Sequence, residues 1–347
     1  MGYRPDLLEA RRGYIATHVR RPGFRAVGAQ APPAGLRPGA RAASRRAETR
    51  RKWYEIIGLT TPAIVIYVMF VLVPMGFAFY YSLFRWRGVG PPTEYVGFRN
   101  YTLAFQDPIF LDALRNNAII VFGSLLIQGP VALGIALLLN RRFRGRSAFR
   151  LLVFVPYVLA EVTVGIMWKL ILTENGTLDA LLQSIGLGGL VQAWLADLDV
   201  VIWTLLFVLT WKYVGFAIIL LLAGLSNVPQ ELNEAAEIDG ASWWQIQRHV
   251  TLPLLGPTIR IWMFLSMIGS LQVFDMVWVT SVPAVRSLGA SATMATYMVD
   301  NGFFARLWGY GNAVAVILFA ISFVAALLFQ RFLLRRDIEG AITRKGK

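Results

Sequence analysis

The sequence contains no cysteine, so disulfide bonds and thiolate metal sites are excluded. Its two histidines, His18 and His249, belong to no metal-binding pattern such as H-E-x-x-H, so a metal site is not expected. A phosphate-binding G-x-x-x-x-G-K-[ST] loop is also missing, because the only Gly-Lys pair is Gly346-Lys347. We therefore expect neither an ATPase site nor a cofactor in this chain.

Charged residues are scarce as well, at 16% of the 347 residues, whereas 56% are hydrophobic. A soluble domain of this length cannot bury so much apolar surface, so the composition indicates a membrane protein. Six apolar spans reach the ~20 residues needed to cross a hydrocarbon layer. They cover residues 56–84, 111–139, 148–172, 200–225, 259–280 and 311–332. The predicted fold class is an all-α integral membrane protein with six transmembrane helices.

The net charge of +14 is distributed unevenly along the chain. Residues 1–52 hold 13 of the 34 basic residues, and most of the others flank the apolar spans. The loop 140–150 and the C-terminus are also basic, whereas the loop 173–199 has no Lys or Arg. This asymmetry is typical of a membrane protein with both termini in the cytoplasm, and it argues against nucleic-acid binding.

Three parts of the chain follow from this pattern. Residues 1–52 are predicted to be a disordered basic tail, with a transit peptide or an overlong start as alternatives. Residues 53–336 form the transmembrane domain, and 337–347 form a basic C-terminal tail. The outer loops 173–199 and 281–310 are each expected to contain a short surface helix, the second near residues 293–300. No inverted repeat relates the two halves, which argues against a secondary transporter.

The cytoplasmic loop 226–257 predicts two short helices. Pro229 suits the first turn of a helix over 231–238, and Gly240 suits its C-terminal end. Ser242 and Gln245 form a capping box for a second helix, which is expected to end at Pro253.

The second helix carries two tryptophans, Trp243 and Trp244, which are expected to be exposed. An exposed aromatic patch indicates a protein partner, but tryptophans also lie at the level of lipid headgroups. Both interpretations stay open on these residues alone.

The pattern E-A-A-x-x-D-G-A at residues 234–241, followed by Leu252-Pro253 and Pro257, resembles the EAA motif of permeases in binding-protein-dependent ABC importers. The residues of this motif are Glu234, Ala235, Ala236, Asp239, Gly240 and Ala241. Stretches at 154–156, 175–178, 211–216 and 274–280 resemble the maltose-type carbohydrate-uptake branch. The resemblance covers about residues 54–336.

This resemblance implies a permease subunit that imports a mono- or oligosaccharide. It would pair with a second homologous permease, an ATPase dimer that holds ATP and Mg, and an extracytoplasmic solute-binding protein. The helix 231–238 would dock in a cleft of the ATPase, with Glu234 as its charged anchor and Asp239-Gly240 shaping the turn.

Ionisable residues at membrane depth are candidates for function, although each could instead form an internal ion pair or hydrogen bond. A sugar site combines aromatic faces with polar groups, and single aromatics could equally face lipid. The candidate substrate-pathway residues are Glu161, Trp211, Lys212, Tyr213, Phe216, Gly269, Ser270, Gln272 and Asp275. Among these, the resemblance implies sugar contacts near Lys212, Tyr213, Phe216, Gly269 and Gln272. In contrast, Asn116, Asn117 and Gln128 are interpreted as hydrogen-bonding links between helices.

Alternative functions remain. An importer of glycerol-phosphate or another polyol or anionic solute is favoured by Lys212 and disfavoured by Glu161 and Asp275. A membrane enzyme would need a titratable cluster, which is not visible, and a scaffold would not need polar residues at membrane depth. A secondary transporter or channel would have no use for the loop 226–257.

Overall fold

The computed structural model describes residues 38–141 and 144–334, and its regular structure is helical throughout these ranges. The one strand-like feature in this part of the chain is an isolated bridge between Phe84 and Tyr95. The first 37 residues of the predicted N-terminal tail and the whole predicted C-terminal tail lie outside the described residues. The chain divides into two units, Met1–Leu72 and Val73–Lys347, which are described separately.

The described part of the first unit consists of α2 (Pro38–Tyr67) and the π-helical η1 (Val68–Leu72). Helix α2 begins inside the predicted tail, so residues 38–52 are helical rather than irregular. Their high content of Ala and Arg explains this, because both are strong helix formers. A candidate membrane span covers Trp53–Ser82, close to the predicted 56–84, and its last part is α3 (Val73–Ser82) of the second unit.

The second unit contains four long apolar helical runs. Helices α5 (Pro108–Gly123), η2 (Ser124–Gln128) and α6 (Gly129–Asn140) form the first, and α10 (Val201–Leu225) forms the second. The third joins α12 (Trp243–Ile246), η4 (Gln247–Thr251) and α13 (Leu252–Leu271), and the fourth joins α17 (Trp308–Phe329) and η6 (Gln330–Leu334). By length and composition, the described residues hold five helices that could cross a membrane, or six if one bent pair counts as a span.

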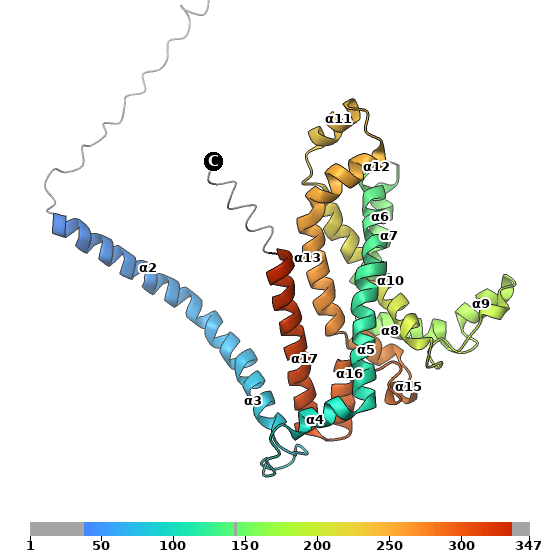
Figure 1. Cartoon of the computed structure of the whole chain (residues 1–347), viewed down its shortest axis with the longest axis horizontal. Helices are drawn as coiled ribbons and strands as arrows, with labels where there is room; N and C mark the ends of the chain where they lie inside the picture. The colour runs from blue at the N-terminus through green and yellow to red at the C-terminus, as the bar shows by residue number, and fades with distance from the viewer. Residues whose placement is uncertain (1–37, 142–143, 335–347) are drawn as a thin grey trace, which may run out of the picture. The chain divides into compact units, whose positions relative to one another are not determined.

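Helix α10 is the central helix of this unit (Figure 1). It is apolar all round and buried along most of its length, as expected for a helix surrounded by others. Toward its N-terminal end, Leu205 packs in a core cluster with Met276. Toward its C-terminal end, Leu221 packs in a second cluster with Trp262 of α13.

The third predicted span is broken. Instead of one helix over 148–172, the chain forms α7 (Arg146–Val158) and α8 (Glu161–Leu172), which are bent by 96° relative to each other. The prediction of one continuous helix is therefore wrong. Pro156 lies in the last turn of α7, where it cannot donate a backbone hydrogen bond, and Leu159 and Ala160 are extended.

Lys212 of α10 satisfies the carbonyl groups at this break. Its Nζ donates to the carbonyl oxygens of Pro156 and Tyr157, both at 2.9 Å, and to that of Leu159. The side chain is only 2% exposed, and an ammonium group has three donors, so all of them are used. The positive charge also lies at the C-terminal, negative end of the α7 dipole. Lys212 thus caps the broken helix.

The fifth predicted span differs in two ways. The second helix of the loop 226–257 does not end at Pro253 but continues into α13, because a π turn precedes the proline: the Leu252 N–H donates to the Gln247 carbonyl five residues back. The run then ends at Leu271 rather than 280, and α14 (Asp275–Thr280) starts after a short non-helical link.

The loop 173–199 contains α9 (Thr177–Ser184), which confirms the predicted helix, and η3 (Gly188–Leu190). Asp179 is buried and holds this loop together, since its carboxylate accepts bonds from Trp194 Nε1 at 2.8 Å and the Asn175 N–H at 2.9 Å.

The loop 281–310 contains α15 (Pro283–Ser287), α16 (Met294–Val299) and η5 (Asp300–Phe304). The helix predicted near 293–300 exists, but α16 is buried among α4 (Arg99–Gln106), α5 and α17 rather than lying on the surface. The Tyr297 hydroxyl donates to Asp107 Oδ2 at 2.6 Å, and burial together with this bond raises the pKa of Tyr297 well above its usual value.

Two asparagines of α5 fix this buried loop in place. Asn116 Nδ2 donates to the Gly289 carbonyl at 2.8 Å, and Asn117 Oδ1 accepts from the Met294 N–H at 2.8 Å. The interpretation of Asn116 and Asn117 as links between segments is confirmed.

Replacing Lys212 with Met keeps the length of the side chain but removes its donors. We expect Lys212→Met to lower the free energy of unfolding by roughly 3 kcal/mol, because three partly buried carbonyl groups lose their hydrogen-bond donor. Unfolding of the purified chain in detergent measures this, with Lys169→Met as the control, since Lys169 is exposed on α8. Equal losses in both variants would contradict the capping role.

Candidate functional site

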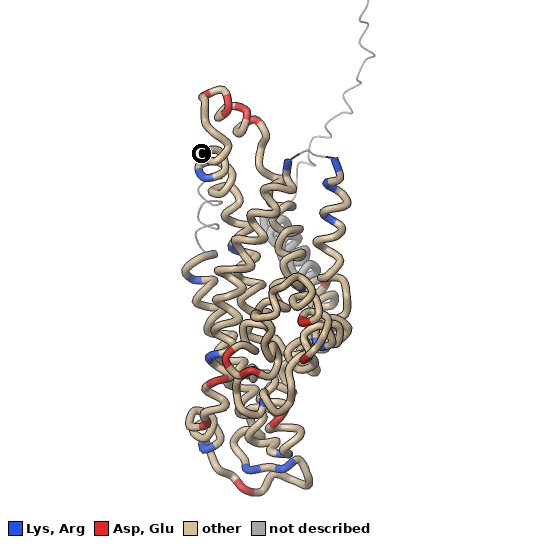
Figure 2. Tube along the Cα trace, turned by 90° about the vertical axis from the view of Figure 1, so that its right-hand side faces the viewer, with Lys and Arg blue, Asp and Glu red and all other residues tan. Residues whose placement is uncertain are grey.

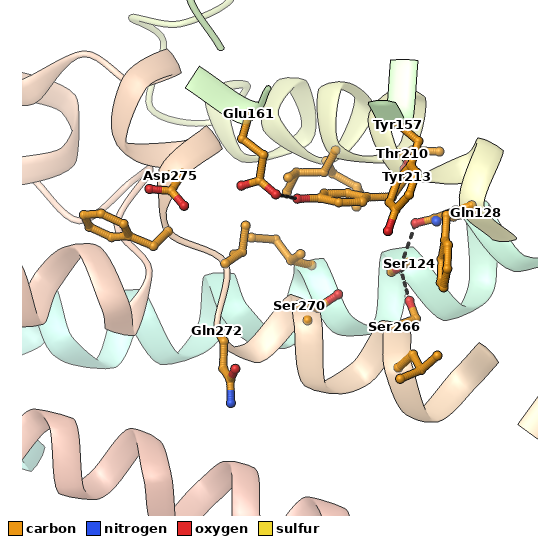
Figure 3. A pocket seen from close by; sticks show the side chains of 18 of the residues that line it. Ser124, Gln128, Tyr157, Glu161, Thr210, Tyr213, Ser266, Ser270, Gln272 and Asp275 are labelled. Carbon is orange, nitrogen blue, oxygen red and sulfur yellow. Dashed lines mark hydrogen bonds between the residues drawn. The ribbon is translucent and has the colours of Figure 1, made fainter. Parts of the chain in front are cut away.

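A cavity of about 470 Å³ lies beside both chain breaks (Figure 3). Its walls come from α5 and η2, from the ends of α7 and α8 that flank the first break, from α10, and from α13 with the link to α14. The cavity thus brings together side chains from four of the predicted apolar spans, 111–139, 148–172, 200–225 and 259–280.

One wall of the cavity is aromatic. The rings of Tyr157 on α7 and Phe216 on α10 stack with centroids 5.0 Å apart, and Tyr213 lies 6.3 Å from Tyr157. Gly215 permits this close approach of the two helices, because a Cβ atom there would lie 2.2 Å from the Val153 carbonyl oxygen. The glycine thus sets the position of the aromatic wall.

The opposite wall is polar. Ser124 Oγ donates to Gln128 Oε1 at 2.8 Å and lies 2.6 Å from Ser266 Oγ of α13. Gln128 was interpreted as a link between helices, but its bond to Ser124 stays within η2; the contact between helices is made by Ser124 and Ser266. The amide of Gln128 therefore belongs to the cavity wall.

Two carboxylates complete the lining. Glu161 is the first residue of α8, and its Oε1 accepts a bond of 2.6 Å from the Tyr213 hydroxyl (Figure 3). Asp275 is the first residue of α14, and no hydrogen bond or ion pair joins its side chain to another described residue. Both positions suit an acidic side chain, because a helix N-terminus carries a partial positive charge. Within the described ranges, no group of three or more acidic and histidine side chains could hold a metal ion.

The cavity brings together seven of the nine candidate substrate-pathway residues. They are Glu161, Tyr213, Phe216, Gly269, Ser270, Gln272 and Asp275. The other two, Trp211 and Lys212, face elsewhere, because only residues three or four apart share a face of α10. Trp211 packs edge-to-face against Trp168 of α8 with centroids 5.3 Å apart, and Lys212 caps α7.

Several lining residues were missed by the sequence reasoning, among them Tyr157, Ser124 and Thr210. The hydroxyls of Ser124 and Thr210 carry no charge and follow no motif, so nothing in the sequence distinguishes them from structural serines and threonines. Tyr157 next to Pro156 is a signal in retrospect, because a proline in an apolar span marks a place where the helix can end.

The loop at the other candidate site folds as two helices. Helix α11 (Gln230–Ile238) ends before Gly240, whose φ of +80° fits the predicted C-terminal glycine. The Ser242 N–H donates to Gln245 Oε1 at 2.7 Å, which confirms the predicted capping box. A groove of about 380 Å³ lies between the end of α11 and α12, beside Gly240.

Exposed apolar side chains stand on both helices of this loop. Ile238 is 87% exposed and Trp244 is 69% exposed. Trp243 behaves differently, since it packs against the second core cluster and under the Arg141 guanidinium, 4.4 Å from its ring centroid. One tryptophan is therefore structural and the other is free to contact a partner.

Residues 128–337 match the family described as the binding-protein-dependent transport system inner membrane component. Since this match covers more than half of the chain, the protein belongs to that family and is a multi-pass inner-membrane permease. The resemblance found in the EAA motif is thereby confirmed.

Similar proteins include two permeases from sugar systems. The chain is 34% identical to the diacetylchitobiose uptake system permease protein NgcF of Streptomyces coelicolor, over 82% of this chain and 83% of that protein. It is 31% identical to the arabinooligosaccharides transport system permease protein AraP of Bacillus subtilis, over 78% and 85%. A solved bacterial ABC transporter involved in alginate import has the same fold, with a TM-score of 0.72 and 22% identity over 84% of this chain and 99% of that one.

A methyl group at Gly215 would collide with the backbone of α7. We expect Gly215→Ala to lower the free energy of unfolding in detergent by about 2 kcal/mol, because forced overpacking of two helices is destabilising. The matched control is Gly134→Ala on α6, where an added Cβ meets nothing within 4 Å, and it should leave stability unchanged or slightly higher. A stable Gly215→Ala variant would show that α7 and α10 are not held at this distance.

Proposed function

We propose that this chain forms half of the translocation pathway for an oligosaccharide in an ATP-driven importer. An extracytoplasmic binding protein would deliver the sugar, a second homologous permease would complete the pathway, and an ATPase dimer would supply the energy. Family membership supports the transport role, and the names of the diacetylchitobiose and arabinooligosaccharide relatives support a sugar as the cargo.

The observation that carries the proposal is the two-sided wall of the cavity. A sugar ring is apolar on its faces and polar on its edges, so it needs an aromatic surface and hydrogen-bonding groups at the same time. Tyr157 and Phe216 offer the aromatic surface, while Ser124, Gln128 and Ser266 offer hydroxyl and amide groups. A cavity of about 470 Å³ is large enough to hold part of an oligosaccharide.

Removing one ring from the aromatic wall tests this assignment. We expect Phe216→Ala to slow oligosaccharide import about tenfold in cells that express the whole transporter, because stacking of an aromatic ring is worth roughly 1 kcal/mol or more beyond its burial. Phe207→Ala is the control: Phe207 lies on the same helix, is 57% exposed and does not line the cavity. If both variants import at equal rates, the aromatic wall does not contact the sugar.

We also propose that α11 is the coupling element that docks on the ATPase. Between Gln230 and Ala241 the loop carries four acidic residues and no basic one, and Figure 2 shows these acidic residues gathered at the tip of the loop. Gln230 Nε2 donates to Glu234 Oε1 at 2.7 Å, which holds the carboxylate in one position. The exposed Ile238 adds an apolar anchor. The complementary surface would be a basic cleft with an apolar pocket.

This assignment sets the orientation of the chain. The end that carries α11 and α12 would face the cytoplasm with both termini, as the distribution of Lys and Arg predicts. The opposite end, with α9, α15 and α16, would face the binding protein (Figure 1). Movement of the ATPase would then reach the cavity through α12 and α13, which also carry Ser266 and Gly269 of its wall.

A substitution in the turn after α11 tests the proposed contact between α11 and the ATPase. We expect Gly240→Trp to abolish co-purification of the ATPase while the second permease is retained, because a bulky side chain is forced into the groove and the left-handed backbone is strained. Gly186→Trp is the control, since Gly186 has the same φ of +80° in the loop after α9. A pull-down from detergent measures both, and retention of every partner by Gly240→Trp would remove the coupling role.

A further inference from the structure

The lining of the cavity is unbalanced in charge. Among its residues are two carboxylates, Glu161 and Asp275, whereas no Lys, Arg or His side chain takes part. The remaining polar groups are hydroxyls and amides, which carry no net charge.

The nearest base does not restore the balance. Lys212 was the residue that favoured an anionic solute, but its ammonium donates to three backbone carbonyls and is almost fully buried. It therefore has no donor left for a solute. If the buried Lys212 ammonium is included, one positive charge lies near two carboxylates. The electrostatic potential in the cavity is therefore negative.

Both carboxylates are free to act on a solute. Asp275 is exposed and has no hydrogen bond or ion pair with another described residue, and Glu161 uses one oxygen to accept the Tyr213 bond. Figure 3 shows the two on the same side of the cavity, with the Glu161–Tyr213 bond drawn between them and the aromatic wall. A negative solute here meets two like charges at close range, and such repulsion lowers its affinity for the cavity.

We infer that Glu161 and Asp275 are specificity-determining residues that exclude anionic saccharides and admit uncharged or amine-bearing ones. This inference rests on the proposed function, because it requires that the sugar passes through the cavity. The fold itself does not determine the charge of the cargo: a structural neighbour with 22% identity is described as importing alginate, an acidic polysaccharide. The discrimination therefore has to come from side chains such as these two.

Two matched pairs of sugars separate charge from shape. One pair is trigalacturonate and its uncharged methyl ester, and the other is the glucosamine trimer and its uncharged N-acetyl form. The full chain, with the subunits that co-purify with it, is placed in lipid nanodiscs without binding protein, and equilibrium binding of each probe is measured at pH 6. We expect the acid to bind at least about tenfold more weakly than its ester, and the amine at least as tightly as its N-acetyl form.

Removing the charges of Glu161 and Asp275 should then remove the difference in affinity between the ester and the acid. In Asp275→Asn with Glu161→Gln, the ratio between the affinities for the ester and the acid should fall to about threefold or less, because the like charges that weaken binding of the acid are gone. Asp275→Asn alone should lower this ratio by a smaller amount. Because the Asp275 side chain has no bonding partner among the described residues, this variant tests the inference without risk to the fold. Glu174→Gln is the control, because Glu174 is exposed in the outer loop and does not line the cavity.

The outcomes separate this inference from the function on which it rests. If the ester binds and the acid binds equally well, or if the double variant keeps the wild-type ratio, the charge filter is wrong and the sugar pathway stands. If none of the four probes binds, both the filter and the saccharide assignment of the cavity are overturned.

Discussion

The contact between the Lys212 ammonium and the last carbonyls of α7 is the interaction on which the rest of this structure depends. A helix that ends inside a membrane leaves carbonyl groups without partners, and hydrocarbon offers none. One buried side chain on the central helix supplies three donors at that point. Because α7 can end there, Tyr157 on its last turn and Glu161 on the first turn of α8 face the same cavity.

The second break, between α13 and α14, also places side chains around the cavity. Between α13 and α14 the chain leaves helical geometry for three residues, and side chains on both sides of this link line the cavity. Non-helical backbone at membrane depth is tolerated where it is buried in protein or borders a cavity, and both breaks meet that condition. The two acidic residues of the lining are the first residues of the helices that follow the breaks, where the helix dipole favours a carboxylate.

The sequence predicted the apolar segments, the capping box at Ser242 and the glycine end of α11, because these depend on composition or on neighbours within four residues; five of the six predicted spans are single helical runs. It did not predict the breaks. Hydropathy is averaged over a window and carries no information about continuity, and the partner that stabilises the first break lies 53 to 56 residues away along the chain. The prediction that the second helix of the loop 226–257 ends at Pro253 was also wrong, because a single π turn allows the helix to continue through the proline. At the cavity, the resemblance pointed to residues on α10 and α13, which both contribute to the lining, but only the rotation of α10 separates Tyr213 and Phe216 from Trp211 and Lys212.

The helical run from Trp243 to Leu271 has a mechanical consequence. Its 29 residues are helical without a break, but the run bends near the π turn Gln247–Thr251, so that α12 lies at an angle to α13 (Figure 1). At 1.5 Å per residue, about 26 Å separate Leu252 from Gly269 along α13. A rod of that length acts as a lever: a tilt of about 5° about one end moves the other by roughly 2 Å. Small displacements at the loop end of the rod are thus sufficient to alter the width of the cavity at the other, without any change in the fold of the helices between them.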